Sequence, residues 1–69
     1  MTPVRVRVNG EARTVSDEAT VRTLLQDLGA THDGVAVAVN DELVLRGTWD
    51  DRRLHDDDVV EVLSAAPGG

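Results

Sequence analysis

The sequence predicts an α+β domain with one helix packed on one face of a four- to five-stranded sheet. Three observations predict this class: a turn-forming Asn9-Gly10 pair between two alternating segments, one segment with apolar residues at helical spacing, and several short Val- and Leu-rich runs. A chain of 69 residues forms one small domain. Because one helix cannot cover both faces of a sheet, the second face is expected to be open to water or to a partner.

The first expected element is a β-hairpin. Apolar and basic residues alternate in Val4–Val8, which is the period-2 pattern of a strand with one buried face. Asn9-Gly10 follows, and this pair favours a type I′ turn because both of its central residues need positive φ. The returning strand is then Glu11–Val15, in a register that places Arg13 opposite Val6. Either the stem of Arg13 covers the rim of the sheet while its guanidinium reaches water, or a bulge interrupts the pairing.

A helix is expected over residues 21–28, because its apolar residues fall at i, i+3, i+4 and i+7. These residues are Val21, Leu24, Leu25 and Leu28. Thr20 is a suitable N-cap, and Gly29 suits the left-handed position just past the helix end. A helix this short is marginal in water, so it must dock on the sheet.

Three further strands are expected over residues 35–39, 43–46 and 59–63. The last run is too apolar for a free edge and is predicted to be central in the sheet. Residues 47–54 are expected to be irregular or to form a short helical turn. They carry Trp49, the single aromatic residue, which is expected to close one end of the core, with an interface anchor as the alternative.

The second face of the sheet is expected to carry charges from the first and last strands. These charges are Arg5, Arg7 and Glu61. If the two strands are neighbours, the charges can pair across the sheet.

The composition excludes several function classes. The formal net charge is −6, with a pI near 4.5, so direct nucleic-acid binding is disfavoured and a basic protein partner is favoured. Without cysteine there is neither thiolate chemistry nor a Cys-based zinc site. We expect no membrane span, because apolar runs stay far below the roughly 20 residues that a span needs. The N-terminus lacks a secretory signal pattern, so the expected location is the cytoplasm.

Candidate catalytic residues are few. The possible bases are His32 and His55, both in predicted loops, where a histidine is usually solvated. Hydroxyl groups such as those of Ser16 and Ser64 lie outside any nucleophile motif. The acidic run 56–58 lacks the spacing of a calcium loop and is read as a solvated turn. We therefore expect a protein that is not an enzyme and binds neither a metal nor a cofactor.

The C-terminal residues are the most informative. We expect a domain over residues 1–63 and a flexible tail over residues 64–69 that ends in Gly68-Gly69. Without Cβ atoms, a Gly-Gly backbone can thread a narrow channel. Five or six extended residues reach up to about 20 Å, which is enough to bring the terminal carboxylate into the active site of a partner.

The chain resembles the ThiS family, the sulfur carriers of thiamine biosynthesis, over nearly its whole length. The resemblance depends on the order and spacing of several segments, which are the Asn9-Gly10 turn, residues 20–25 and 35–40, Arg46-x-x-Trp49, residues 59–62 and Gly68-Gly69. It implies a ubiquitin-like β-grasp fold with a mixed sheet. Two departures are an acidic run at 56–58 where a glycine is usual and Leu45 where a proline is common. Pro67 in addition stiffens the tail.

The resemblance also implies a mechanism. A ubiquitin-activating-type enzyme that uses ATP would adenylate the carboxylate of Gly69. The adenylate would become a thiocarboxylate whose sulfur passes to thiazole synthase. Gly69 is then the sulfur-carrying residue, and the tail that enters the partner's active site comprises Ala66, Pro67 and Gly68.

Two alternatives stay open from the sequence. The chain could be a related sulfur carrier that serves the synthesis of molybdopterin, cysteine or another metabolite. It could also be a β-grasp interaction module with an incidental Gly-Gly end. Removal of Gly69 distinguishes these classes, because only a carrier would lose its activity.

Overall fold

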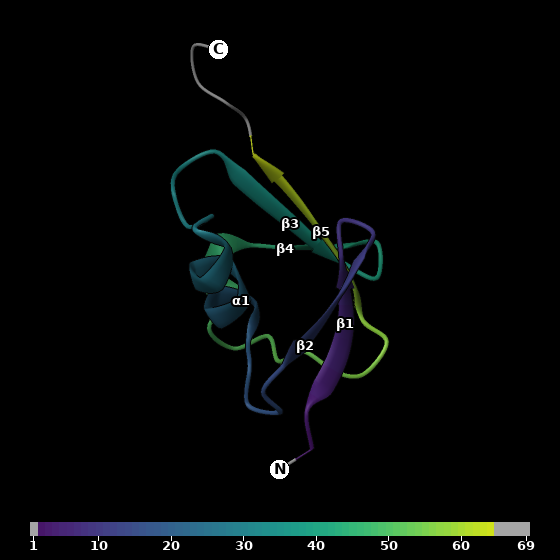
Figure 1. Cartoon of the computed structure of the whole chain (residues 1–69). Helices are drawn as coiled ribbons and strands as arrows, with labels where there is room; N and C mark the ends of the chain where they lie inside the picture. The colour runs from purple at the N-terminus through teal and green to yellow at the C-terminus, as the bar shows by residue number, and fades with distance from the viewer. Residues whose placement is uncertain (1, 65–69) are drawn as a thin grey trace.

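A computed structural model describes residues 2–64. The chain runs through β1 (Val4–Val8), β2 (Glu11–Val15), α1 (Val21–Leu28), β3 (Val35–Val39), β4 (Glu42–Val44), the 3₁₀ helix η1 (Arg46–Thr48) and β5 (Val59–Ser64), as Figure 1 shows. The strands form one sheet in the order β2-β1-β5-β3-β4. β1 and β5 are parallel, whereas the other neighbours are antiparallel. The predicted α+β class with a mixed sheet is confirmed, and so is the central place of the last strand.

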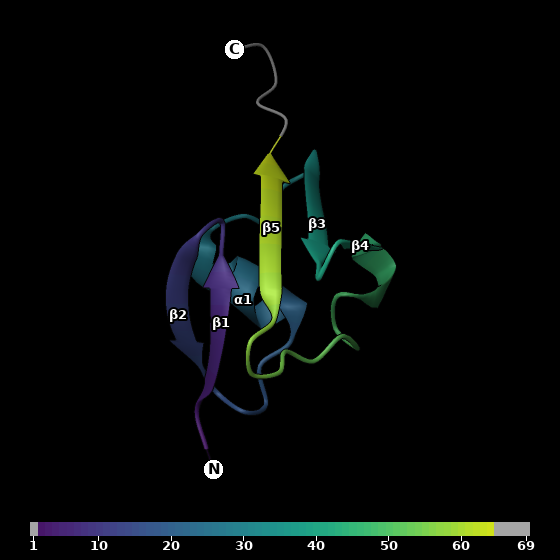
Figure 2. The ribbon, with the colours of Figure 1, turned by 90° about the vertical axis from the view of Figure 1, so that its right-hand side faces the viewer.

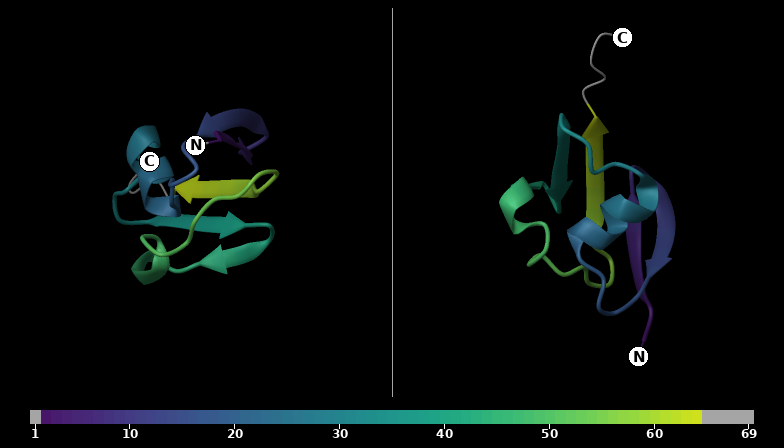
Figure 3. Two further views of the ribbon diagram at one scale, coloured as in Figure 1. Left: turned by 90° about the horizontal axis from the view of Figure 1, so that it is seen from below. Right: turned by 90° about the vertical axis from the view of Figure 1, so that its left-hand side faces the viewer.

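One helix covers one face of this sheet. Figure 3 shows α1 lying across the strands on that side, and Figure 2 shows β5 between β1 and β3. The helix begins after Thr20, whose Oγ1 accepts a hydrogen bond from the Thr23 amide, and Thr23 Oγ1 accepts one from the Thr20 amide. It ends at Leu28, and Gly29 follows as the C-cap with φ of 70°. Both predicted helix ends are confirmed.

The hairpin has the predicted register. Val8 pairs with Glu11, and Val6 with Arg13. Asn9 and Gly10 have φ of 49° and 85°, as a type I′ turn requires. Pairing is continuous from Val4 to Val8, and Arg13 is exposed. Arg13 therefore follows the first of the two alternatives, with its guanidinium free to reach water.

The core lies between α1 and the sheet. Among the side chains that are less than 2% exposed, the largest are Trp49, Leu24, Leu25 and Leu54. Trp49 is 1% exposed, and its Nε1 donates a hydrogen bond to the carbonyl of Val44 at 3.1 Å. The structure thus confirms Trp49 as a core residue, since the indole is buried and its one donor is satisfied.

Two element ends differ from the prediction. β4 covers residues 42–44 instead of 43–46, because the backbone turns into η1 at Arg46. β5 continues through Ser64, which pairs with Val35 at the start of β3. Ser64, assigned to the tail from the sequence, is therefore the last residue of the sheet.

The expected cross-strand charge pairs are not among the ion pairs of residues 2–64. The register explains this difference. The last pair between β1 and β5 is Val8 with Val60, so Glu61 lies beyond the paired part of β1. The backbone amide of Arg5 instead donates to Asp56 Oδ1 at 2.8 Å.

The acidic run before β5 is a turn as predicted, with Asp56 and Asp57 exposed, but its third residue is buried instead of solvated. Asp58 is only 6% exposed. Its Oδ2 accepts from the His55 amide at 2.8 Å, and its Oδ1 accepts from Asn40 Nδ2 at 2.9 Å. Two hydrogen bonds offset the cost of burying this carboxylate.

Neither a membrane span nor a metal cluster is found in the described part of the chain. Over residues 2–64, no helix has the length and hydropathy needed to cross a membrane. The same residues contain no group of three or more potential metal ligands. The cytoplasmic location stays a prediction.

Candidate functional site

The predicted site residues Ala66, Pro67, Gly68 and Gly69 lie outside the described residues. The structure describes the point from which this segment starts, which is Ser64 at the end of β5. Figure 2 shows that β5 continues past the end of β1. The ladder with β1 ends at Val60, whereas the ladder with β3 continues to Ser64.

The side chain of Asn9 occupies the edge of β5 beyond β1. Its Oδ1 accepts from the Val62 amide at 2.9 Å, and its Nδ2 donates to the Val62 carbonyl at 3.2 Å. The Asn9 amide itself donates to the Val60 carbonyl at 2.9 Å. A carboxamide presents one acceptor and two donors, so it can satisfy a strand edge as a neighbouring backbone would. Asn9 thus extends the hydrogen bonding of β1 along β5.

The loop before β3 contacts the end of β5 from the other side. His32 Nε2 lies 2.8 Å from Ser64 Oγ, within hydrogen-bond distance. The guanidinium of Arg46 donates to the carbonyls of Thr31 and His32, at 2.9 Å and 2.6 Å. The same guanidinium lies 4.4 Å from the centre of the Trp49 ring, in cation–π geometry. Arg46 therefore ties the loop that carries His32 to a buried aromatic residue.

The face of the sheet opposite α1 carries exposed apolar side chains around the charged side chain of Glu61, which pairs with Ala38. We call this surface the open face and define it by Ala36, Ala38, Leu43, Val59 and Leu63. Cross-strand pairs join Leu63 to Ala36 and Leu43 to Ala38. Leu63 is 70% exposed and lies one residue before Ser64. Any partner that receives the segment after Ser64 therefore approaches an apolar surface at its base.

His32 and Ser64 form a base–hydroxyl pair that the sequence analysis missed, because the two residues are 32 positions apart. Both are exposed. Nucleophilic catalysis also requires a group that orients the histidine and a pocket that excludes water. No interaction in the described residues orients the His32 ring, so the pair acts as a structural contact.

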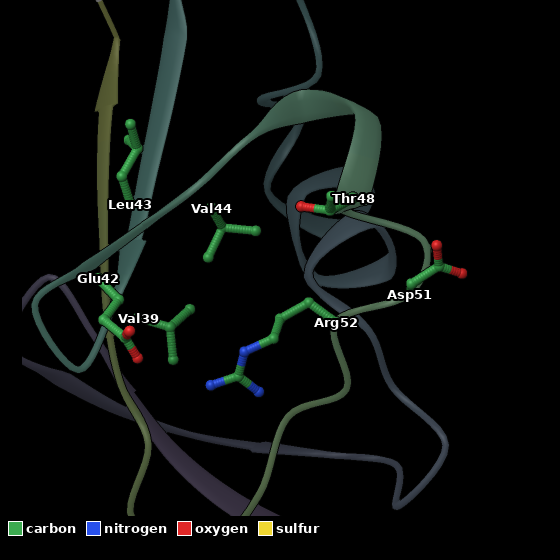
Figure 4. A pocket seen from close by; sticks show the side chains of 7 residues that line it. All are labelled: Val39, Glu42, Leu43, Val44, Thr48, Asp51 and Arg52. Carbon is green, nitrogen blue, oxygen red and sulfur yellow. The ribbon is translucent and has the colours of Figure 1, made fainter.

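A hollow of about 310 Å³ lies elsewhere, between β4 and the segment after η1 (Figure 4). Its charged lining residues are Glu42, Asp51 and Arg52. Figure 4 shows these side chains around the opening together with Val39, Leu43, Val44 and Thr48. Ser64 is not among the lining residues, so this hollow is separate from the base of the tail.

Comparison with known proteins decides the family. The sequence profile of the ThiS family matches residues 6–69. The chain belongs to the ThiS family. It is 41% identical over 64 residues to the sulfur carrier protein ThiS of Thermus thermophilus, a match that covers 93% of this chain and 98% of that protein. The family and the β-grasp fold predicted from the sequence are confirmed, and membership identifies a carrier instead of an enzyme.

Solved structures of ThiS agree with this assignment. The crystal structure of the thiamine biosynthesis protein ThiS from Geobacter metallireducens superposes with a TM-score of 0.79 at 33% identity, covering 96% of this chain and all of that one. A solution structure of a thiamine biosynthesis protein from the same organism gives a TM-score of 0.78 at 32% identity, covering 96% of this chain and 88% of that one.

A larger protein contains a region similar to this ThiS-family chain. It is the thiazole synthase of Magnetococcus marinus, 35% identical over 66 residues. The match covers 96% of this chain but only 20% of that protein.

Proposed function

We propose that this chain carries sulfur for thiazole formation in thiamine biosynthesis, and that the carboxylate of Gly69 is the group that carries it. The observation that carries this proposal is the family match, which extends through Gly68 and Gly69. The globular part then acts as a handle that partner enzymes hold while they modify the tail. A carrier of this kind needs no catalytic group of its own, because its partners perform each chemical step.

The carboxylate of Gly69 is a poor electrophile, so the proposed chemistry begins with its activation. A carboxylate oxygen of Gly69 attacks the α-phosphorus of ATP, and pyrophosphate leaves. The resulting acyl-adenylate has a good leaving group, so a sulfide-level donor can attack its carbonyl carbon and release AMP. The product is a thiocarboxylate, in which one carboxylate oxygen has been replaced by sulfur.

The base of the tail suits this role. Ser64 is the end of the central strand, and residues 65–69 would span roughly 17 Å if extended. Leu63 supplies an exposed apolar contact beside this base. An adenylating enzyme that receives the tail would contact Leu63, because Leu63 lies one residue before Ser64, where the tail begins. The tail is too short to keep the globular part of the chain away from that enzyme.

The second proposed partner is thiazole synthase. In the Magnetococcus marinus protein, a region similar to this chain and a thiazole synthase share one polypeptide. Fusion of two units is expected where one acts directly on the other, because it raises their effective concentration. This observation favours thiamine biosynthesis over the molybdopterin and cysteine alternatives. A basic partner surface, expected from the net charge of −6, stays a prediction that the salt dependence of binding would test.

The test is intact-mass analysis of the chain after incubation with ATP, a ubiquitin-activating-type adenylating enzyme and a sulfide donor. We expect a mass change equal to the exchange of one oxygen for one sulfur, located on the C-terminal peptide. The variant without Gly69 should keep the circular dichroism spectrum of the parent and remain unmodified. Modification of that variant, or none of the parent chain, would overturn the proposal.

A further inference from the structure

We propose that Asn9 and His32 are positioning residues for the sulfur-carrying tail. They hold the last residues of β5 from its two edges, so that the tail leaves the sheet from a fixed point. This inference rests on the proposed function and assigns two side chains to it.

The end of β5 needs such support on the β1 side. Strand pairing with β1 stops at Val60, and four residues of β5 follow. Backbone groups at a free edge would exchange with water and let the strand end fray. The two bonds between the Asn9 carboxamide and the backbone of Val62 cover this edge. Asn9 can reach Val62 because it directly follows β1, the neighbour of β5, and its own amide is bonded to the Val60 carbonyl.

On the β3 side, the support comes from a side-chain contact. Ser64 pairs with Val35, the first residue of β3, so the ladder ends there. The 2.8 Å contact between His32 Nε2 and Ser64 Oγ adds a bond at this terminal position. The backbone of His32 is held in place, because Arg46 binds its carbonyl and stacks on Trp49. The two supports are independent of each other, since they come from different loops.

Fixing the start of the tail at Ser64 affects the rate of adenylation, because it limits the positions that Gly69 can reach. When the globule has docked, the carboxylate samples the volume that the tail can sweep from Ser64. A base that frays lengthens the tail, and the effective concentration of the carboxylate at the nucleotide falls with that length. Docking itself depends on the surface of the globule. Loss of either support therefore lowers kcat for adenylation while leaving KM for the carrier unchanged.

The experiment measures pyrophosphate release by the adenylating enzyme at varied carrier concentration. We expect His32→Ala to lower kcat by up to about twofold with KM unchanged, because fraying lengthens the tail by at most the last four residues of β5 and effective concentration falls roughly as the −3/2 power of length. Ser64→Ala should have the same effect, and the double variant should be no slower than either single one, because both remove the same contact. His32→Gln, which restores a donor and an acceptor, should recover part of kcat.

Asn9 is tested with Asn9→Gly, which keeps the positive φ of the turn but removes the carboxamide. We expect a fall in kcat of similar size, and additivity with His32→Ala. The matched control is His55→Ala, because His55 is the other histidine and lies before the opposite end of β5. A local readout needs no partner: amide nitrogen relaxation should show Ser64 more mobile in His32→Ala, and Val60 unchanged.

Three results would overturn the inference. They are an unchanged kcat in His32→Ala and Asn9→Gly, an equal loss in His55→Ala, or a rise in KM in place of the fall in kcat. Failure of the proposed function is distinguished by the parent chain, which would then release no pyrophosphate at all. If the parent chain releases no pyrophosphate, the relaxation measurement still tests the structural part of the inference. An unchanged mobility of Ser64 in His32→Ala would show that His32 does not restrain the end of β5.

Discussion

The guanidinium of Arg46 lies 4.4 Å from the centre of the Trp49 ring. This contact joins the surface of the molecule to its core, because Trp49 is buried and Arg46 also binds the carbonyls of Thr31 and His32. The Arg46-x-x-Trp49 spacing in the sequence thus marks one structural unit. It holds the loop before β3 against the end of the core.

Replacement of Arg46 by Ala should lower the free energy of unfolding by about 1 kcal/mol, because two exposed hydrogen bonds and a cation–π contact are lost. Urea denaturation followed by circular dichroism measures this change. Arg53→Ala is the matched control, since Arg53 is exposed and contributes its backbone to the contact with Thr20. Equal stability of the two variants would show that the Arg46 contacts contribute nothing.

Replacement of Asp58 by Asn should be destabilising, although the two side chains have nearly the same shape. The carboxylate accepts at both oxygens, from the His55 amide and from Asn40 Nδ2. The amide of Asn has only one oxygen, so its NH2 group would face one of these two donors. We expect the free energy of unfolding to fall by about 1–3 kcal/mol.

The control for Asp58 is Asp57→Asn, because Asp57 is exposed and has φ of 71°, which Asn tolerates. Thermal unfolding separates the two variants, since 1 kcal/mol corresponds to about 4–8 °C for a domain of this size. If both variants melted at the same temperature as the parent, the assignment of Asp58 as a structural acceptor would fail.

Two glycines with open surroundings should respond in opposite ways to replacement by Ala. An added Cβ meets no atom within 4 Å at Gly29 or at Gly47. Gly29 has φ of 70°, so Ala there is strained by about 1–2 kcal/mol. Gly47 lies in η1 and lacks a positive φ, so Ala should be neutral or stabilise by up to about 1 kcal/mol. Chemical denaturation of both variants checks the difference, and a destabilised Gly47→Ala would contradict it.

The open face can be tested without disturbing the core. Leu63→Ser should lower kcat/KM for adenylation about tenfold. Leu63 is exposed beside the base of the tail, and its substitution removes a large apolar side chain that the complex would bury. Val59→Ser is the control at the other end of the same strand face, roughly 13 Å away. We expect Val59→Ser to change kcat/KM by less than about twofold, since an exposed side chain away from the contact contributes little. Equal losses in the two variants would mean that the partner covers the whole open face.

Local patterns were enough to predict several elements. The Asn9-Gly10 turn, its register and both ends of α1 were predicted because each depends on residues within a few positions of one another. The central place of β5 was also predictable, since residues 59–63 are too apolar for a strand at the free edge of a sheet. The candidate site was predicted as the residues after the last strand, and its base was missed by one residue, because pairing of Ser64 with Val35 leaves no local signal.

The sequence by itself determined the faces of the strands, the ends of the helix and the family, because hydrophobic periodicity, capping residues and motif order are written along the chain. Only the tertiary structure decided which groups meet at the two ends of β5. Asn9 and Val62 are 53 positions apart, Arg5 and Asp56 are 51 apart, and His32 and Ser64 are 32 apart. The physical reason is that a period-2 pattern fixes the face of a strand but not its neighbour, and these contacts exist only after β5 has aligned between β1 and β3.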